Sequence, residues 1–132
     1  MSELTRIPAP DGVAPAAAYT HVVMGTGRFV AISGQLALDE DGKLVGEADP
    51  AAQAHQVFEN LHRCLASAGA TFDDVVKLTF FVTDMAYMPA IRVARATHIP
   101  DDRLPAASAV QVAALVRPEF LMEIEAFAVI GE

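Results

Sequence analysis

Apolar residues recur at spacings of three and four between positions 54 and 68, which is the pattern of an amphipathic helix. Asp49 suits the N-cap, Pro50 the first helical position, and Gly69 the residue after the C-cap. We expect Gln53 to contribute to the capping interaction at the N-terminus. The apolar face consists of Ala54, Val57, Phe58, Leu61, Leu65 and Ala68. The solvated side is expected to carry Gln53, Gln56, Glu59, Asn60 and Arg63.

A second helix is predicted from about Met85 to His98. Asp84 can cap its start, and Pro89 falls within about the first turn, where a missing backbone N–H is tolerated. The following segment, residues 100–105, begins and ends with proline and is interpreted as a loop.

Other segments show the apolar and β-branched pattern of strands. They span residues 19–24, 28–38, 75–83, 107–115 and 121–130. Gly25-Thr26-Gly27 predicts a turn between the first two, so this pair is interpreted as a hairpin. In the third segment Leu78, Phe80 and Val82 share one face. Prolines and a glycine within residues 8–15 predict an irregular arm before the first strand.

The predicted order is therefore ββαβαββ. It indicates an α+β fold, a two-layer sandwich in which two helices cover one face of a mixed, mostly antiparallel sheet. The other face is not polar enough to stand in water. Apolar Leu115, Phe127 and Val129 share their strand faces with Gln111, Glu123 and Glu125. Such a mixture is typical of an oligomer interface that lines a ligand site. A ligand site would also explain why Glu123 and Glu125 interrupt an apolar strand.

Composition narrows the function classes. The 132 residues are expected to form one domain, residues 1–132, and 53% of them are hydrophobic. No apolar run reaches the roughly 18–20 residues needed to cross a bilayer, and no signal peptide is visible, so we expect no membrane partner. The mean hydropathy of +0.34 then favours burial of apolar surface between subunits.

Charge and cysteine content exclude further classes. The net charge is -8 and the nine Lys and Arg residues are scattered, which argues against a nucleic-acid partner. Cys64 is the single cysteine, so an intrachain disulfide is excluded and a reducing, cytoplasmic location fits best. No Cys, His or carboxylate cluster has metal-ligand spacing.

Residues spread along the whole chain, in order and at matching spacing, together resemble the YjgF/RidA family. They are Tyr19, Ser33-Gly34-Gln35, Gln53, Asn60-Leu61, Ala68-Gly69, Asp74 to Thr79, Phe81 to Asp84, Pro105-Ala106, Ser108 and Glu123 to Ala126. The resemblance implies a chorismate-mutase-like fold and a homotrimer whose sheets close into a central barrel, with clefts between subunits. The best-known members hydrolyse reactive imines and enamines to keto acids and ammonia, with no cofactor or metal.

The resemblance also implies roles for individual residues. Glu123 matches the glutamate that positions or activates water, while Tyr19 and the backbone near Ser33 and Gly34 match residues that line the cleft. The family arginine that fixes the substrate carboxylate is Ala107 here, a frequent cysteine is Ala109, and a frequent asparagine on the second helix is Arg92. A methyl group cannot bind a carboxylate. The chain therefore resembles an Arg-lacking subgroup rather than RidA proper, and we expect 2-aminoacrylate deamination to be absent or very weak.

Each candidate residue has an alternative interpretation. Glu123 is either the catalytic group or a structural partner of Arg92, Arg117 or Lys77 across an interface. Arg92 is either a surface residue or an anchor that replaces the missing arginine from another direction. A nucleophilic role for Ser33 is not expected, because the sequence shows no His and Asp that would accompany it as in a catalytic triad.

Different function classes also stay open. The first is cofactor-free hydrolysis of an imine, an enamine or a related C=N substrate bound between subunits. The second is a trimer that binds a metabolite or stabilises a partner protein without catalysis. An endoribonuclease is the third, and the negative charge disfavours it.

Overall fold

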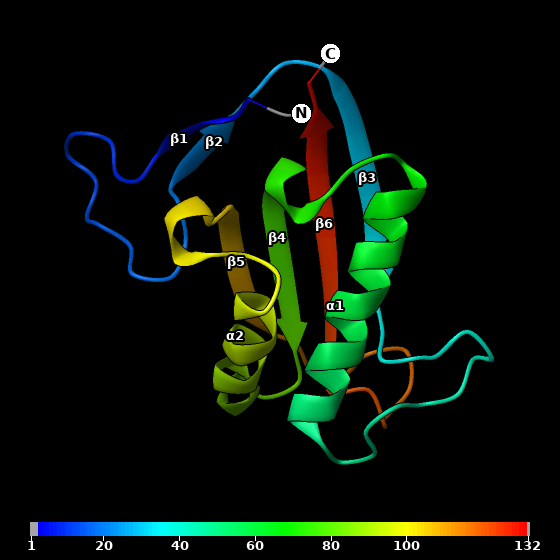
Figure 1. Cartoon of the computed structure of the whole chain (residues 1–132). Coiled ribbons are helices and arrows are strands. Elements are labelled where there is room, and N and C mark those ends of the chain that lie inside the picture. The colour runs from blue at the N-terminus through cyan, green and yellow to red at the C-terminus, as the bar shows by residue number, and fades with distance from the viewer. Residues whose placement is uncertain (1–2, 132) are drawn as a thin grey trace.

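In the computed structural model, which describes residues 3–131, two helices cover one face of a four-stranded sheet (Figure 1). The sheet order is β3-β6-β4-β5, where β4 and β5 are parallel and the other pairs antiparallel. Its strands are β3 (Arg28–Gln35), β4 (Val75–Val82), β5 (Ala106–Gln111) and β6 (Met122–Ile130). The helices are α1 (Pro50–Ser67) and α2 (Met88–Ala96). The predicted α+β sandwich with a mixed, mostly antiparallel sheet is confirmed.

The predicted hairpin at the start of the chain is wrong. The strand β2 (Val22–Met24) pairs antiparallel with β1 (Thr5–Ile7), in a separate two-stranded sheet, and not with β3. Gly27 has φ +141° and lies against the backbone of Ile130, where a Cβ would collide with the carbonyl group. The glycine therefore carries the chain from the small sheet into the main sheet, where β3 takes β6 as its partner.

Other boundaries are shorter than the sequence predicted. Strand β3 ends at Gln35 and β5 at Gln111, so Leu115 lies in the loop before β6. A 3-10 turn, η2 (Met85–Tyr87), precedes α2, and the Asp84 side chain caps this turn by accepting a hydrogen bond from the Ala86 N–H at 2.9 Å.

Helix α1 has the predicted ends. The Asp49 carboxylate accepts a hydrogen bond from the Ala52 N–H at 3.1 Å. Gly69 has φ +77°, and its N–H donates to the Ala66 carbonyl while that of Ala70 donates to the Leu65 carbonyl, which is a Schellman motif. The apolar face is fully buried at Ala54, Val57, Phe58, Leu61 and Leu65.

The Gln53 side chain does not lie on the solvated side of α1, as the sequence predicted. Gln53 is fully buried, because it lies on the same helix face as Val57, a buried residue one turn further along α1. Its amide nitrogen donates to the carbonyls of Gly46 at 2.9 Å and Glu119 at 3.0 Å, and its amide oxygen accepts from the Leu121 N–H at 2.9 Å. Gln53 therefore joins α1 to the loop that leads into β6.

Within residues 3–131, the opposite face of the sheet carries no helix (Figure 1). Phe29 of β3 is 66% exposed there, and its ring lies 5.6 Å from that of Phe127 on β6. We call this side the open face. Glu123 and Glu125 also project from it, since the alternating β6 residues Met122, Ile124 and Ala126 are buried on the helix side.

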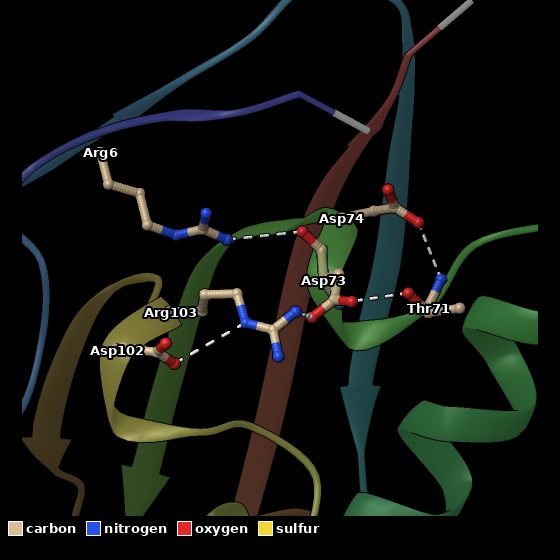
Figure 2. A network of polar contacts seen from close by, with 6 residues as sticks. All are labelled: Arg6, Thr71, Asp73, Asp74, Asp102 and Arg103. Carbon is tan, nitrogen blue, oxygen red and sulfur yellow. Dashed lines mark hydrogen bonds and ion pairs between the residues drawn. The ribbon is translucent and has the colours of Figure 1, made fainter. Parts of the chain in front are cut away.

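A polar network fixes the loops at one end of the sheet (Figure 2). Arg103 Nη1 lies 2.9 Å from Asp73 Oδ1, and Arg6 donates to the Asp73 carbonyl at 3.5 Å. Thr71 and Asp74 close a capping box around the 3-10 turn η1 (Phe72–Asp74). Because Arg103 lies in the 3-10 turn η3 (Asp101–Arg103), the network holds the segments from which β4 and β5 start.

No helix within residues 3–131 is long and apolar enough to span a membrane.

Candidate functional site

A cavity of about 400 Å³ lies between α2, the edge strand β5 and the segment that carries Tyr19. Its lining includes Tyr19, Arg92, Ala107 and Ala109, so the structure brings these sequence-predicted site residues together. Ala107 and Ala109 pair in register with Leu78 and Phe80 of β4, and therefore face α2. Their methyl groups leave open the space that longer side chains would fill. We call this cavity the α2 pocket.

Apolar side chains of β4 and α2 form the inner wall of the α2 pocket. They are Phe80, Met88 and Ile91, none of which is more than 6% exposed. The pocket thus has a dry wall on one side and two cationic side chains on another.

Arg95 is a charged residue of the α2 pocket that the sequence pattern did not reveal. It lies three residues after Arg92 on α2, and a spacing of three places both on one helix face. That spacing was visible in the sequence, but nothing in the pattern showed that the second arginine is buried. Arg95 is only 8% exposed.

The Arg95 guanidinium is incompletely paired. Its Nη1 donates to the Ala18 carbonyl at 3.2 Å, and its Nη2 lies 4.0 Å from Asp101 Oδ1, on a side chain that is 89% exposed. The buried Nε has no hydrogen-bond partner among the described residues. Burial lowers the pKa of Arg95, the Asp101 carboxylate raises it, and the charge of Arg92 lowers it again.

Backbone contacts hold the Tyr19 segment against this pocket. Thr20 donates from its N–H to the Pro105 carbonyl and from its hydroxyl to the Leu104 carbonyl, just before β5. Tyr19 is 39% exposed, and its ring packs edge-on against that of His21 at a centroid distance of 5.1 Å. Tyr19 is therefore placed at the pocket by the same loop that starts β5.

A second group of predicted site residues lies on the other side of the sheet. Glu123 of β6 crosses over Gly34 of β3, where an added Cβ would collide with the Glu123 carboxylate. The β3–β6 register shifts between Ile32 and Gln35, so Ser33 and Gly34 lie in an irregular stretch of the strand. Gly34 therefore gives the carboxylate its room.

Glu123 does not pair with the cations that the sequence offered as structural partners. Lys77 Nζ donates to Ser108 Oγ at 2.9 Å, and Arg117 Nε lies 3.7 Å from Glu119 Oε2. Among residues 3–131, Glu123 takes part in no ion pair. The structural interpretation places the partner of Glu123 across an interface between copies, so both interpretations of this residue stay open.

One chain keeps these two groups apart. The α2 pocket is on the helix side at β5, whereas Gly34 and Glu123 meet on the open face, with β4 between β5 and β6. No group of three or more His, Cys, Asp or Glu residues in the described part of the chain could hold a metal ion.

Comparison with known proteins matches nearly the whole chain. The family model described as endoribonuclease L-PSP matches residues 10–130. The chain is 37% identical to 3-aminoacrylate deaminase RutC of Acinetobacter baylyi over 119 residues, which cover 90% of this chain and 93% of that protein. It is 35% identical to a RutC-family protein of Synechocystis, with 89% of each chain covered.

Solved structures agree with the sequence matches. The Rid-family protein YyfB of Yersinia pestis superposes with a TM-score of 0.84 at 37% identity, covering 95% of this chain and 98% of the other. RidA of an Antarctic Psychrobacter gives a TM-score of 0.72 at 34% identity, with 95% and 94% covered. The chain therefore belongs to the endoribonuclease L-PSP family, which is the YjgF/RidA family that its sequence resembles.

Proposed function

We propose that this protein hydrolyses a small enamine or imine to a carbonyl compound and ammonia. The observation that carries the proposal is the Glu123 carboxylate, which has no ion-pair partner within residues 3–131 and has Gly34 beside it to leave it room. The similarity to a 3-aminoacrylate deaminase supports the same reaction class.

Glu123 suits the proton transfers of this reaction. The enamine takes a proton on the carbon next to its C–N carbon and becomes an iminium ion. Water then adds to the C=N carbon while a carboxylate accepts the proton that water releases, which gives a neutral amino alcohol. The same carboxylate returns a proton to nitrogen, and the C–N bond breaks as the new hydroxyl group loses its proton. The products are ammonia and a carbonyl compound whose oxygen comes from water. Every step is a proton transfer, a water addition or a loss of ammonia, which side chains and water can perform.

The active cleft is proposed to form between copies of the chain in a homotrimer. One copy supplies Ser33, Gly34 and Glu123 from its open face, and the next supplies the α2 pocket with Tyr19, Arg92, Ala107 and Ala109. The exposed aromatic surface around Phe29 and the mean hydropathy of +0.34 support burial of the open face. In this arrangement Tyr19 and the backbone at Ser33 and Gly34 orient the substrate beside the carboxylate.

The experiment compares ammonia release from freshly generated 3-aminoacrylate by the native protein and by Glu123→Gln. We expect the native protein to exceed the spontaneous rate and Glu123→Gln to lose about 100-fold of that activity, since general acid–base catalysis is worth roughly 10²–10⁴-fold. Glu125→Gln, the same charge change on the same strand face, is the matched control.

Three outcomes would contradict this function. Native protein that never exceeds the spontaneous rate on a panel of enamines and imines would leave a non-catalytic binding protein. Full activity in Glu123→Gln would remove its catalytic role. An equal loss in Glu123→Gln and Glu125→Gln would assign the effect to assembly and not to chemistry.

A further inference from the structure

The α2 pocket is cationic in a protein that is strongly anionic. The chain carries a net charge of -8 and only nine Lys and Arg residues, yet two of these line this one cavity. In the part of the chain that the structure describes, no Asp or Glu lines it. A pocket with two guanidiniums and no carboxylate is therefore electrostatically incomplete in the chain by itself.

Arg95 is costly to bury in the state that the structure shows. A buried charge is stabilised only where paired carboxylates or several hydrogen bonds replace the lost water. Here one carbonyl accepts from Nη1, the nearest carboxylate is an exposed one at 4.0 Å, and the buried Nε has no partner in residues 3–131. The guanidinium thus has unused capacity to bind an anion.

Arg92 adds a second unused cation on the same helix face. It is exposed, and among the described residues it forms neither a hydrogen bond nor an ion pair. Two positive charges one turn apart repel each other. An anion that binds between them in the pocket stabilises both guanidiniums. Planar guanidiniums are suited to a carboxylate, since each can offer paired N–H groups to its two oxygens.

We propose that the α2 pocket binds a small carboxylate through Arg95 and Arg92, with the apolar part of the molecule over Ala107 and Ala109. This inference rests on the proposed function and deepens it by giving the substrate a negative charge and a position. The anchor comes from the helix and not from the strand position 107. Phe80, Met88 and Ile91 supply the apolar wall, which favours a carboxylic acid with a hydrocarbon body over a bare inorganic anion.

The test titrates the assembled protein with benzoate, neutral benzamide and inorganic phosphate in a calorimeter. Benzoate and benzamide have nearly the same shape and differ in charge. We expect benzoate to bind at least about tenfold more tightly than benzamide, and Arg92→Gln and Arg95→Gln each to weaken benzoate by about tenfold while leaving benzamide unchanged. Arg63→Gln, which removes the same charge from the surface of α1, should bind benzoate like the native protein.

The contrary results are equally specific. Equal binding of benzoate and benzamide, or native benzoate affinity in Arg92→Gln, would overturn the anchor. Tighter binding of phosphate than of benzoate would overturn the assignment of a carboxylate. Because Arg92 is exposed, its variant decides the question even where Arg95→Gln proves too unstable to titrate. Benzoate needs no turnover, so the anchor can stand or fall separately from the ammonia assay.

Discussion

Helices α1 and α2 cover the same face of the sheet, and each buries a polar side chain that the sequence pattern did not mark as buried. Gln53 of α1 is fully buried and uses both ends of its amide in three hydrogen bonds. Arg95 of α2 is nearly as buried, but its Nε has no partner within residues 3–131 and its nearest carboxylate is 4.0 Å away.

We interpret this difference as one between a residue that serves the fold and one that is proposed to serve a ligand. Buried polar groups are normally satisfied, so Gln53 is fully explained by the loops that it joins. A buried guanidinium without its full set of partners is not explained by the fold. The contrast predicts that Gln53 governs stability and that Arg95 governs binding.

Replacing Gln53 should have the largest effect on stability. Gln53→Leu leaves the Glu119 carbonyl and the Leu121 N–H without their partner, while the Gly46 carbonyl keeps the Asp49 N–H. We therefore expect the free energy of unfolding to fall by about 2–4 kcal/mol in urea denaturation. Gln56→Leu is the control, because Gln56 is only partly buried and its bonds run to Leu38 and Asn60. An equal loss in the two variants would contradict the special role of Gln53.

Moving the arginine back to the strand should shift the substrate preference. We expect Ala107→Arg with Arg92→Asn, the pattern more usual in the family, to raise 2-aminoacrylate deamination about tenfold, since hydrogen bonds to charged groups are worth roughly 1.5–3 kcal/mol. Ala107→Arg alone should gain less, because three guanidiniums would then crowd one pocket. Steady-state kinetics of ammonia release measures both. Equal gains in the single and the double variant would show that the helix arginine does not interact with the site.

Removing the Arg95 charge should cost little stability. Arg95→Met loses one hydrogen bond to Ala18, but it also removes the cost of burying a poorly paired cation, so we expect a change below about 1 kcal/mol. Urea denaturation of Arg95→Met beside Gln53→Leu measures the contrast directly. A loss as large as that of Gln53→Leu would place Arg95 among the residues that hold the fold.

His98, which follows α2, should give the smallest effect. Burial is the main cause that lowers the pKa of His98 from its ordinary value of 6.5. The charge of His62 lowers this pKa further, the charge of Glu59 raises it, and the charge of His55 lowers it. The unfolded chain therefore binds a proton at His98 more readily than the folded chain does. The stabilisation that neutral His98 contributes is complete above about pH 6.5, and it is lost as the pH falls through the pKa of the folded state. His98→Phe keeps the ring contacts with Phe58 and Phe72. We expect its Tm to change less between pH 7 and pH 5 than the Tm of the native protein does.

The control for the His98 prediction is His55→Gln, which removes an exposed histidine from α1. Because His55 is the smallest of the four causes that shift the pKa of His98, this variant should keep most of the native pH dependence. A native slope in His98→Phe would mean that other groups cause the acid sensitivity.

Much of the fold could be predicted because local chemistry set it. The Asp49 cap, the apolar face of α1 and the glycine after it are short-range signals, and the structure confirms them. The pairing of β1 with β2 could not be predicted, since three-residue strands carry almost no periodicity and Gly27 permits a redirection as readily as a hairpin.

The candidate site was predictable only in part. Resemblance pointed to Tyr19, Arg92, Ala107 and Ala109, which do line one pocket, and to Glu123 beside Gly34. Arg95 was missed because its burial depends on the Tyr19 segment and on η3, which pack against α2 from distant parts of the chain. A sequence pattern predicts on which face of a helix a residue lies, but it does not predict which distant segments cover that residue.

The proposed function requires that the α2 pocket of one copy and Glu123 of another form one active site. Subunits of Glu123→Gln and of Arg92→Gln/Arg95→Gln, each expected to be inactive, can be mixed in equal amounts and reassembled. Random mixing should leave about a quarter of the clefts with both halves intact, and ammonia release should recover to about a quarter of the native rate. Mixed subunits that stay as inactive as their parents would contradict a site shared between copies.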